Sequence, residues 1–150
     1  NSLRGEVPQG GYSVPIGEAV IRREGTQLSL ISYGLSVHHC LEAAEALSAE
    51  GISCEVVDLR TVRPLDSATL LESVQKTGRA CIVHEDNLTG GVGAEVAAII
   101  AKDGFEYLDA PIQRVAAPDV PSFPYSPILE DALLPGPADI VKTARDLSAY

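Results

Sequence analysis

The chain has 150 residues, which is enough for one domain with a single sizeable hydrophobic core. Hydrophobic residues make up 45% and charged residues 21%, as in ordinary globular proteins, and no apolar run approaches the length that crosses a bilayer. The formal net charge of −10 argues against nucleic acid and anionic membranes as partners, because both repel an acidic surface.

The first residue and the cysteines bear on where the chain comes from. It has no methionine and begins with Asn1, so we expect a fragment excised from a longer protein. Cys40, Cys54 and Cys81 are odd in number and widely spaced, and no two form a C-x-x-C pair. We interpret them as small buried residues of a protein from a reducing cytoplasm; a metal or redox role is the alternative.

The elements follow one another in a regular alternation. Residues 1–15 are rich in Gly and Pro, so we predict a linker arm there and one domain over residues 16–150. In chain order the predicted elements are a strand at 17–23, a strand at 28–33, a helix capped by Ser36 and ended by Gly51, a strand at 54–59, a helix from Asp66 to Gly78, a strand at 80–83, a helix opening at Thr89 or Gly90, a strand at 112–116, and a final helix with Pro137 in its first turn. Unbroken apolar strands between helices predict an α/β fold with a largely parallel sheet covered on both faces.

The segment 117–135 breaks this alternation. It has five prolines and no predicted element, and long connections of this kind usually contact partners. Phe123, Tyr125, Ile128 and Leu129 place apolar side chains where no internal element needs them. We therefore expect these four residues to lie in a subunit interface.

Two motifs suggest a ligand site at the end of the strand 80–83. Residues 89–93 (TGGVG) form a glycine-rich turn of the kind that exposes N–H groups to an anion, but they match neither G-x-G-x-x-G nor a P-loop. Close packing of helix on strand is the preferred interpretation. His84-Glu85-Asp86 precede the turn, and adjacent strand residues point to opposite faces, so we expect hydrogen bonding at the sheet rim rather than a metal site.

No other constellation predicts catalysis. His38 and His39 are adjacent on a predicted helix and cannot chelate one ion together. Arg60 and Arg63 could bind an anion, but ion pairs with Asp58 or Asp66 are the preferred interpretation. The residues therefore predict no catalytic, cofactor-binding or metal-binding set in this chain.

Several sequence blocks, taken in order, resemble the C-terminal domain of the transketolase superfamily. They are PIGEAVIRREGTQLSLISYG, EVVDLRTVRPLD and KTGRACIVHEDNLTGGVGAEVAAII. The later block LDAPIQRVAAPDVPSFPYSPILEDALLP is similar to the E1 β subunits of pyruvate, branched-chain 2-oxoacid and acetoin dehydrogenases. The resemblance covers residues 12–150, and GEVPQGGYSVPIG resembles the connector that precedes this domain in the family.

The resemblance implies a fold, an activity and a set of partners. The fold would be a three-layer α/β/α sandwich with a five-stranded, mostly parallel sheet and an antiparallel edge strand. The parent enzyme would be a multienzyme-complex oxidoreductase that decarboxylates a 2-oxoacid with thiamine diphosphate and Mg²⁺ and passes the acyl group to a lipoyl group of E2. These cofactors are expected to bind outside this domain, because the chain has no Gly-Asp-Gly motif with a downstream Asn.

The partners implied are the E1 α subunit, a second E1 β and the peripheral-subunit-binding domain of the E2 acyltransferase. Asp109 and the carboxylate at Tyr150 match positions similar to those that dock E2 in E1 β relatives. The alternative is that Asp109 only caps a turn before Pro111 and that the C-terminus frays. The compartment implied is the cytoplasm of a bacterium, or the mitochondrial matrix in a eukaryote.

Three other readings stay open. The equivalent domain of 1-deoxyxylulose-5-phosphate synthase or of transketolase would share the fold, but the proline-rich loop after Arg114 resembles E1 β better. A non-catalytic flavodoxin-like binding module would need an acidic cluster after its first strand and a Lys on its last. Ser32-Tyr33-Gly34 and Val115-Ala116-Ala117 occupy those places.

Overall fold

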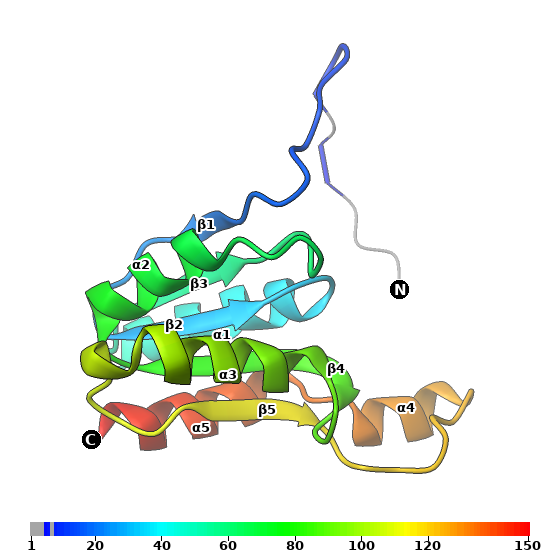
Figure 1. Cartoon of the computed structure of the whole chain (residues 1–150). Coiled ribbons are helices and arrows are strands. Elements are labelled where there is room, and N and C mark those ends of the chain that lie inside the picture. The colour runs from blue at the N-terminus through cyan, green and yellow to red at the C-terminus, as the bar shows by residue number, and fades with distance from the viewer. Residues whose placement is uncertain (1–4, 7) are drawn as a thin grey trace.

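A computed structural model describes residues 5–6 and 8–150 of the chain (Figure 1). The elements, in order, are β1 (Val20–Arg23), β2 (Leu28–Ser32), α1 (Ser36–Ala49), β3 (Cys54–Asp58), α2 (Ser67–Thr77), β4 (Ala80–Asn87), α3 (Val92–Asp103), the 3₁₀ turn η1 (Phe105–Tyr107), β5 (Gln113–Ala117), α4 (Pro127–Leu133) and α5 (Pro137–Ser148). In the part of the chain that is described, no helix has the length and apolar content needed to cross a membrane.

The strands form one five-stranded sheet in the order β1-β3-β2-β4-β5. β1 pairs with β3 in antiparallel fashion, while β2 pairs in parallel with both β3 and β4, and β4 with β5. This confirms the predicted mixed sheet with an antiparallel edge. Because Val20 stands opposite Asp58, the chain enters the sheet beside the carboxyl end of β3.

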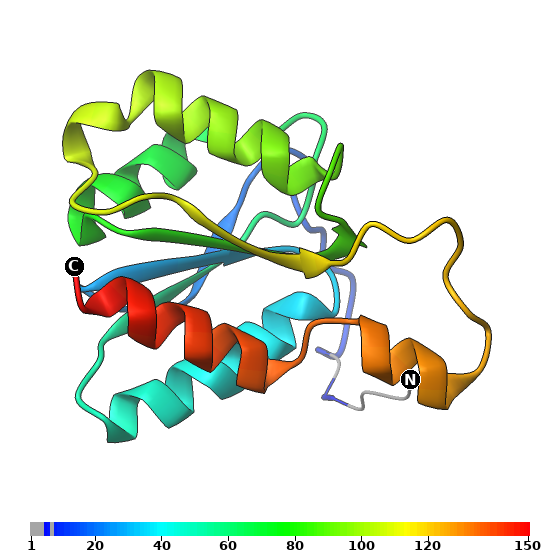
Figure 2. The same ribbon diagram turned by 90° about the horizontal axis from the view of Figure 1, so that it is seen from below.

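Helices cover both faces of the sheet, so the predicted three-layer architecture is confirmed. Figure 2 shows α1 and α5 on one side and α2 and α3 on the other. Successive strand residues point to opposite faces, and the core divides accordingly. Leu30, Val56 and Cys81 pack in the layer under α1 and α5, and Ile31, Val57 and Ile82 pack in the layer under α2 and α3. Each fully buried aliphatic side chain contributes about 1.5–3 kcal/mol to folding.

The ends of α2 follow the sequence prediction. Asp66 is the N-cap, and its Oδ1 accepts the N–H of Thr69 at 3.1 Å. Gly78 ends the helix with a φ of 70°, a left-handed conformation that glycine adopts without cost. Local sequence chemistry therefore sets both boundaries of this helix.

Two predicted helix starts were wrong. The N-cap of α1 is Leu35, and Ser36 lies inside the first turn, where its buried Oγ has no hydrogen-bond partner among the described atoms. α3 begins at Val92, after Thr89 and Gly90, because the strand before it is longer than predicted. β4 continues to Asn87, which is paired with Ala117 of β5.

The segment 117–135 also differs from the prediction, because it contains the seven-residue helix α4. Pro127 occupies the first turn, where its missing N–H has no intrahelical partner to lose. None of the residues of α4 is buried, so no apolar periodicity in the sequence marks it. In Figures 1 and 2, α4 projects from the carboxyl end of the sheet.

Candidate functional site

The ring of His84 packs against the glycine-rich turn that follows β4. A Cβ atom on Gly91 would lie 2.7 Å from Cε1 of His84, and one on Gly93 would lie 2.3 Å from Nε2 of the same ring. Asp119 supplies a carboxylate to the turn: its two oxygens accept the N–H and the hydroxyl of Thr89 at 2.9 and 2.7 Å. These bonds from Thr89 hold the pKa of Asp119 below its usual range. The preferred interpretation of the turn, close packing of helix on strand, is confirmed.

His84 is not bonded at the sheet rim as expected. Its side chain is fully buried, and neither ring nitrogen has a hydrogen-bond partner in the described structure. Burial lowers its pKa, the nearby Asp86 opposes this change, and Arg114 adds to it. The expectation was therefore wrong for His84, whereas Asp86 does accept a hydrogen bond, from the N–H of Asn87 at 2.7 Å. An imidazole enclosed in this way has no access to a substrate.

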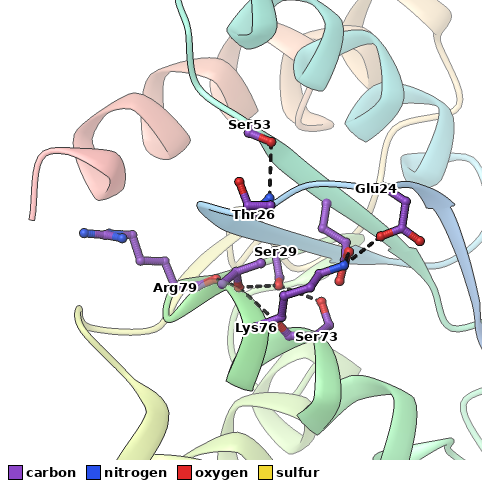
Figure 3. Close-up of polar contacts among 9 residues, drawn as sticks. Glu24, Thr26, Ser29, Ser53, Ser73, Lys76 and Arg79 are labelled. Atoms are coloured by element: carbon purple, nitrogen blue, oxygen red, sulfur yellow. Dashed lines mark hydrogen bonds and ion pairs between the residues drawn. The ribbon is translucent and has the colours of Figure 1, made fainter.

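A buried acid is held at the other end of the sheet (Figure 3). Glu55 of β3 is 1% exposed and forms an ion pair with Nζ of Lys76, which also contacts Glu24 at 2.7 Å. Hydrogen bonds to Glu24 and Glu55 raise the pKa of Lys76, and the bond to Lys76 lowers the pKa of Glu24. Sequence reasoning missed this cluster, although a glutamate inside the apolar run of β3 was a visible signal.

Hydroxyl groups extend the same polar layer. The Ser29 hydroxyl of β2 bonds with the hydroxyls of Ser73 and Thr77 of α2, each at 2.7 Å (Figure 3). Ser29 stands beside Glu55 in the β2–β3 pairing, so α2 is attached here through polar contacts. With its groups bonded to one another, the layer is suited to fixing the position of α2 rather than to acid–base chemistry.

The cysteines are all buried and unpaired, as predicted. Burial raises the pKa of the Cys40 thiol to about 12 and that of Cys54 to about 11, and it also raises the pKa of Cys81. Over residues 5–6 and 8–150, no three His, Cys, Asp or Glu side chains are placed to hold a metal ion. His38 is exposed to solvent.

The two residues predicted to dock a partner lie at the amino end of the strands. The N–H of Asp109 donates to the carbonyl of Gly78 at 2.8 Å, and the exposed Asp109 carboxylate lies over that glycine. Tyr150 is 70% exposed at the end of the chain. The connection from η1 to β5 and the C-terminal end lie at the same end of the molecule in Figures 1 and 2. Phe105, 74% exposed on η1, is an additional aromatic that the sequence did not single out.

The residues predicted to form a subunit interface lie at the opposite end. Tyr125 is fully exposed, Ile128 is 82% exposed and Leu129 is 56% exposed, while Phe123 is half-buried. In Figures 1 and 2, α4 and the segment before it lie at the opposite end of the sheet from the C-terminal end and from the connection between η1 and β5.

The expected ion pairs of Arg60 and Arg63 are not formed. Oδ1 of Asp58 accepts the backbone N–H of Arg60 at 2.9 Å, and Asp66 accepts from Ala19 and Thr69. In the described part of the chain, neither arginine side chain has an acidic partner within ion-pair distance.

Comparison with known proteins identifies the family to which this chain is similar. The sequence model described as "Transketolase, C-terminal domain" matches residues 17–140. The chain is 45% identical to the 2-oxoisovalerate dehydrogenase subunit beta of Bacillus subtilis over 99% of its residues, and 49% identical to the pyruvate dehydrogenase E1 component subunit beta of the same organism over 99%. It is 47% identical to the acetoin:2,6-dichlorophenolindophenol oxidoreductase subunit beta of Cupriavidus necator over 95%. It spans 45%, 45% and 42% of these relatives, so less than half of each.

Solved structures agree on the fold. A protein described as a split gene transketolase, in an inactive beta4 tetramer, superposes with a TM-score of 0.79 and 26% identity over 92% of this chain and 44% of that one. A transketolase from Pichia stipitis superposes with a TM-score of 0.57 and 11% identity over 89% of this chain and 18% of that one.

Proposed function

The chain belongs to the transketolase C-terminal domain family, and from this we propose that it is the C-terminal assembly and docking domain of the E1 β subunit of a 2-oxoacid dehydrogenase. The observation that carries the proposal is the 45–49% identity to three β subunits along 95–99% of the chain. The parent enzyme would oxidatively decarboxylate a 2-oxoacid and transfer the acyl group to a lipoyl group of E2. It would act in the cytoplasm of a bacterium or in a mitochondrial matrix.

Thiamine diphosphate and Mg²⁺ would serve the parent enzyme from outside this domain. The described residues do not fit a magnesium diphosphate site, because they place no three potential ligands together and the glycine turn is occupied by His84 and Asp119. Calorimetric titration of the chain with thiamine diphosphate and Mg²⁺ is expected to give no saturable heat. Micromolar binding would contradict this division of roles.

The α4 end of the domain would contact the E1 α subunit or a second E1 β. Tyr125, Ile128 and Leu129 present apolar side chains to solvent in the isolated chain, and such patches generally mark contact sites. Replacing Ile128 by Asp should leave the melting temperature of the chain unchanged, since the side chain is 82% exposed, and should prevent assembly of the parent protein. Assembly of this variant at the wild-type concentration would contradict the interface.

The test of the whole proposal is reconstitution. The full-length protein that contains this chain is co-expressed with its cognate α subunit and assayed with pyruvate, 2-oxoisovalerate and a ketose phosphate donor. Turnover of a 2-oxoacid with lipoylated E2 as acceptor is the expected result. Ketol transfer between sugar phosphates would instead assign the chain to a transketolase.

A further inference from the structure

The loop of residues 59–64, here called the arginine loop, joins β3 to α2 and is held in a fixed shape. Arg60 has a φ of 55°, a left-handed conformation that side chains other than glycine rarely adopt. Its N–H is bonded to Asp58, and the hydroxyl of Thr61 accepts the N–H of Gly17 at 3.0 Å and donates to the carbonyl of Pro64 at 2.9 Å. Backbone strain that is over-determined by surrounding bonds often marks a functional segment.

Within the described residues, the side chains of Arg60 and Arg63 in this loop have no acidic partner at ion-pair distance. Asp58 and Asp66, the nearest acids in the sequence, are occupied by backbone and threonine donors. By contrast, Arg23 and Arg145 are each paired with a glutamate. On a chain of net charge −10, the arginine loop is therefore a local cationic surface.

A cavity of about 390 Å³ opens beside the loop. Its lining is mixed: Val62, Pro64, Leu65 and Ile99 are apolar, and Arg63, Ser67 and Glu95 are polar or charged. Val62, one of the lining residues, is 43% exposed, and Ile16 is 77% exposed next to Gly17, the residue bonded to the loop. The surface thus combines exposed arginines with a cavity whose wall is apolar on the part formed by Val62, Pro64, Leu65 and Ile99.

We infer that the arginine loop and this cavity dock a polypeptide segment in which an acidic residue stands next to an aliphatic one, contributed by another subunit of the assembly. The inference rests on the proposed function for the existence of that subunit. Carboxylates would pair with Arg60 and Arg63, and the aliphatic side chain would enter the cavity beside Val62. A polypeptide is favoured over a small anion because both arginines are exposed and the cavity beside them, which also contains Glu95, has four apolar lining residues that a small anion would not use.

The experiment uses the full-length protein with its cognate α subunit. Arg60→Asn keeps a residue that tolerates the left-handed conformation, and Arg63→Gln removes the second charge. Lys142→Gln, an exposed position on α5, is the matched control for the loss of one positive charge. Sedimentation at low and high salt measures the dissociation constant of the assembly, and circular dichroism measures the melting temperature of each variant.

Each arginine variant is expected to weaken assembly about tenfold at low salt and the double variant about a hundredfold, with unchanged melting temperatures, while the control behaves as wild type. If both arginine variants assemble with the wild-type dissociation constant, this inference is overturned and the proposed function still stands. Failure of the wild-type subunits to assemble would overturn the proposed function and the inference with it. Tight binding of inorganic phosphate that depends on both arginines would replace the polypeptide with a small anion.

Discussion

His84 lies against Gly91 and Gly93, so the change in stability on replacing Gly93 by Ala depends on two opposing effects. Alanine in place of glycine inside a helix ordinarily adds about 0.5–1 kcal/mol of stability. In the second position of α3, however, the new Cβ of Gly93→Ala would lie 2.3 Å from the buried ring of His84. Overpacking of this kind costs about 1–3 kcal/mol, so the clash decides the sign.

We therefore predict that Gly93→Ala lowers the free energy of unfolding by about 1–2 kcal/mol, measured by urea denaturation. Gly11→Ala is the control, because no atom of the described residues lies within 4 Å of its added Cβ, and it should leave the free energy of unfolding unchanged. In a His84→Ala background, where the clashing ring is absent, Gly93→Ala should cost less stability than it does in the wild-type background. A Gly93→Ala chain as stable as wild type would show that the ring moves freely.

The same histidine predicts a pH dependence. Burial lowers the pKa of His84 in the folded chain, whereas a histidine in the unfolded chain has a pKa of about 6.5. Between the two values the unfolded state binds more protons, so this contribution is complete above about pH 6.5 and is lost as pH falls toward the folded pKa. His84→Leu loses no internal hydrogen bond of the ring in the described structure. From pH 7.5 to 5.5, wild type should therefore lose more stability than this variant, as measured by urea denaturation at the two pH values; equal losses would contradict the prediction.

At the scale of elements, the polar layer under α2 is the feature with the clearest consequence. Lys76 is the cation paired with Glu55, which is 1% exposed, while the Lys76 side chain itself is 41% exposed. Replacing Lys76 by Met leaves a buried carboxylate unpaired, and removing one member of such a pair typically costs several kcal/mol. Because water reaches the lysine, we expect a loss of about 2 kcal/mol at pH 7.

Lys142→Met on α5 is the control. The double variant Glu55→Leu and Lys76→Met should recover most of the stability, since an apolar pair of similar volume commonly replaces a buried ion pair without loss. A single variant with no effect on thermal or urea unfolding would mean that the pair contributes nothing.

The elements also show what sequence can and cannot predict. Both ends of α2 could be predicted from Asp66 and Gly78, because an N-cap side chain and a left-handed glycine each fix the backbone of residues next to them in the sequence. The extent of β4 did not, because Asn87 is held by pairing with Ala117 thirty residues later. α4 was missed because it buries no residue and so leaves no periodic pattern. The predicted ion pairs of Asp58 and Asp66 with arginine were wrong. Both carboxylates accept backbone N–H groups instead, and the sequence does not show which N–H groups need such an acceptor.

For the whole molecule, the separation of the two predicted contact surfaces allows each to be tested without disturbing the other. Asp109 is exposed in the isolated chain, and an exposed charge usually contributes about 0–1 kcal/mol to binding, chiefly through the association rate. We predict that Asp109→Ala weakens binding of the cognate E2 peripheral-subunit-binding domain less than tenfold at low salt and that high salt removes the difference.

The control for this prediction is Asp131→Ala on α4, which makes the same charge change at the other end of the sheet and should leave E2 binding unchanged. Isothermal titration at two salt concentrations measures both variants. An affinity for the E2 domain that changes neither with salt concentration nor with the Asp109 substitution would place the docking surface elsewhere on the domain.

The three buried thiols give the molecule a set of internal reporters. Only a thiolate reacts with an alkylating reagent, and burial both shields these sulfur atoms and raises their pKa values. Alkylation of Cys40, Cys54 and Cys81 therefore requires the core to open, and its rate reports how often that happens. A fourth cysteine introduced at the exposed Ser122 would react alone in the folded protein. A dye attached there would sense the approach of a partner to the α4 end while every native residue of the core stayed in place.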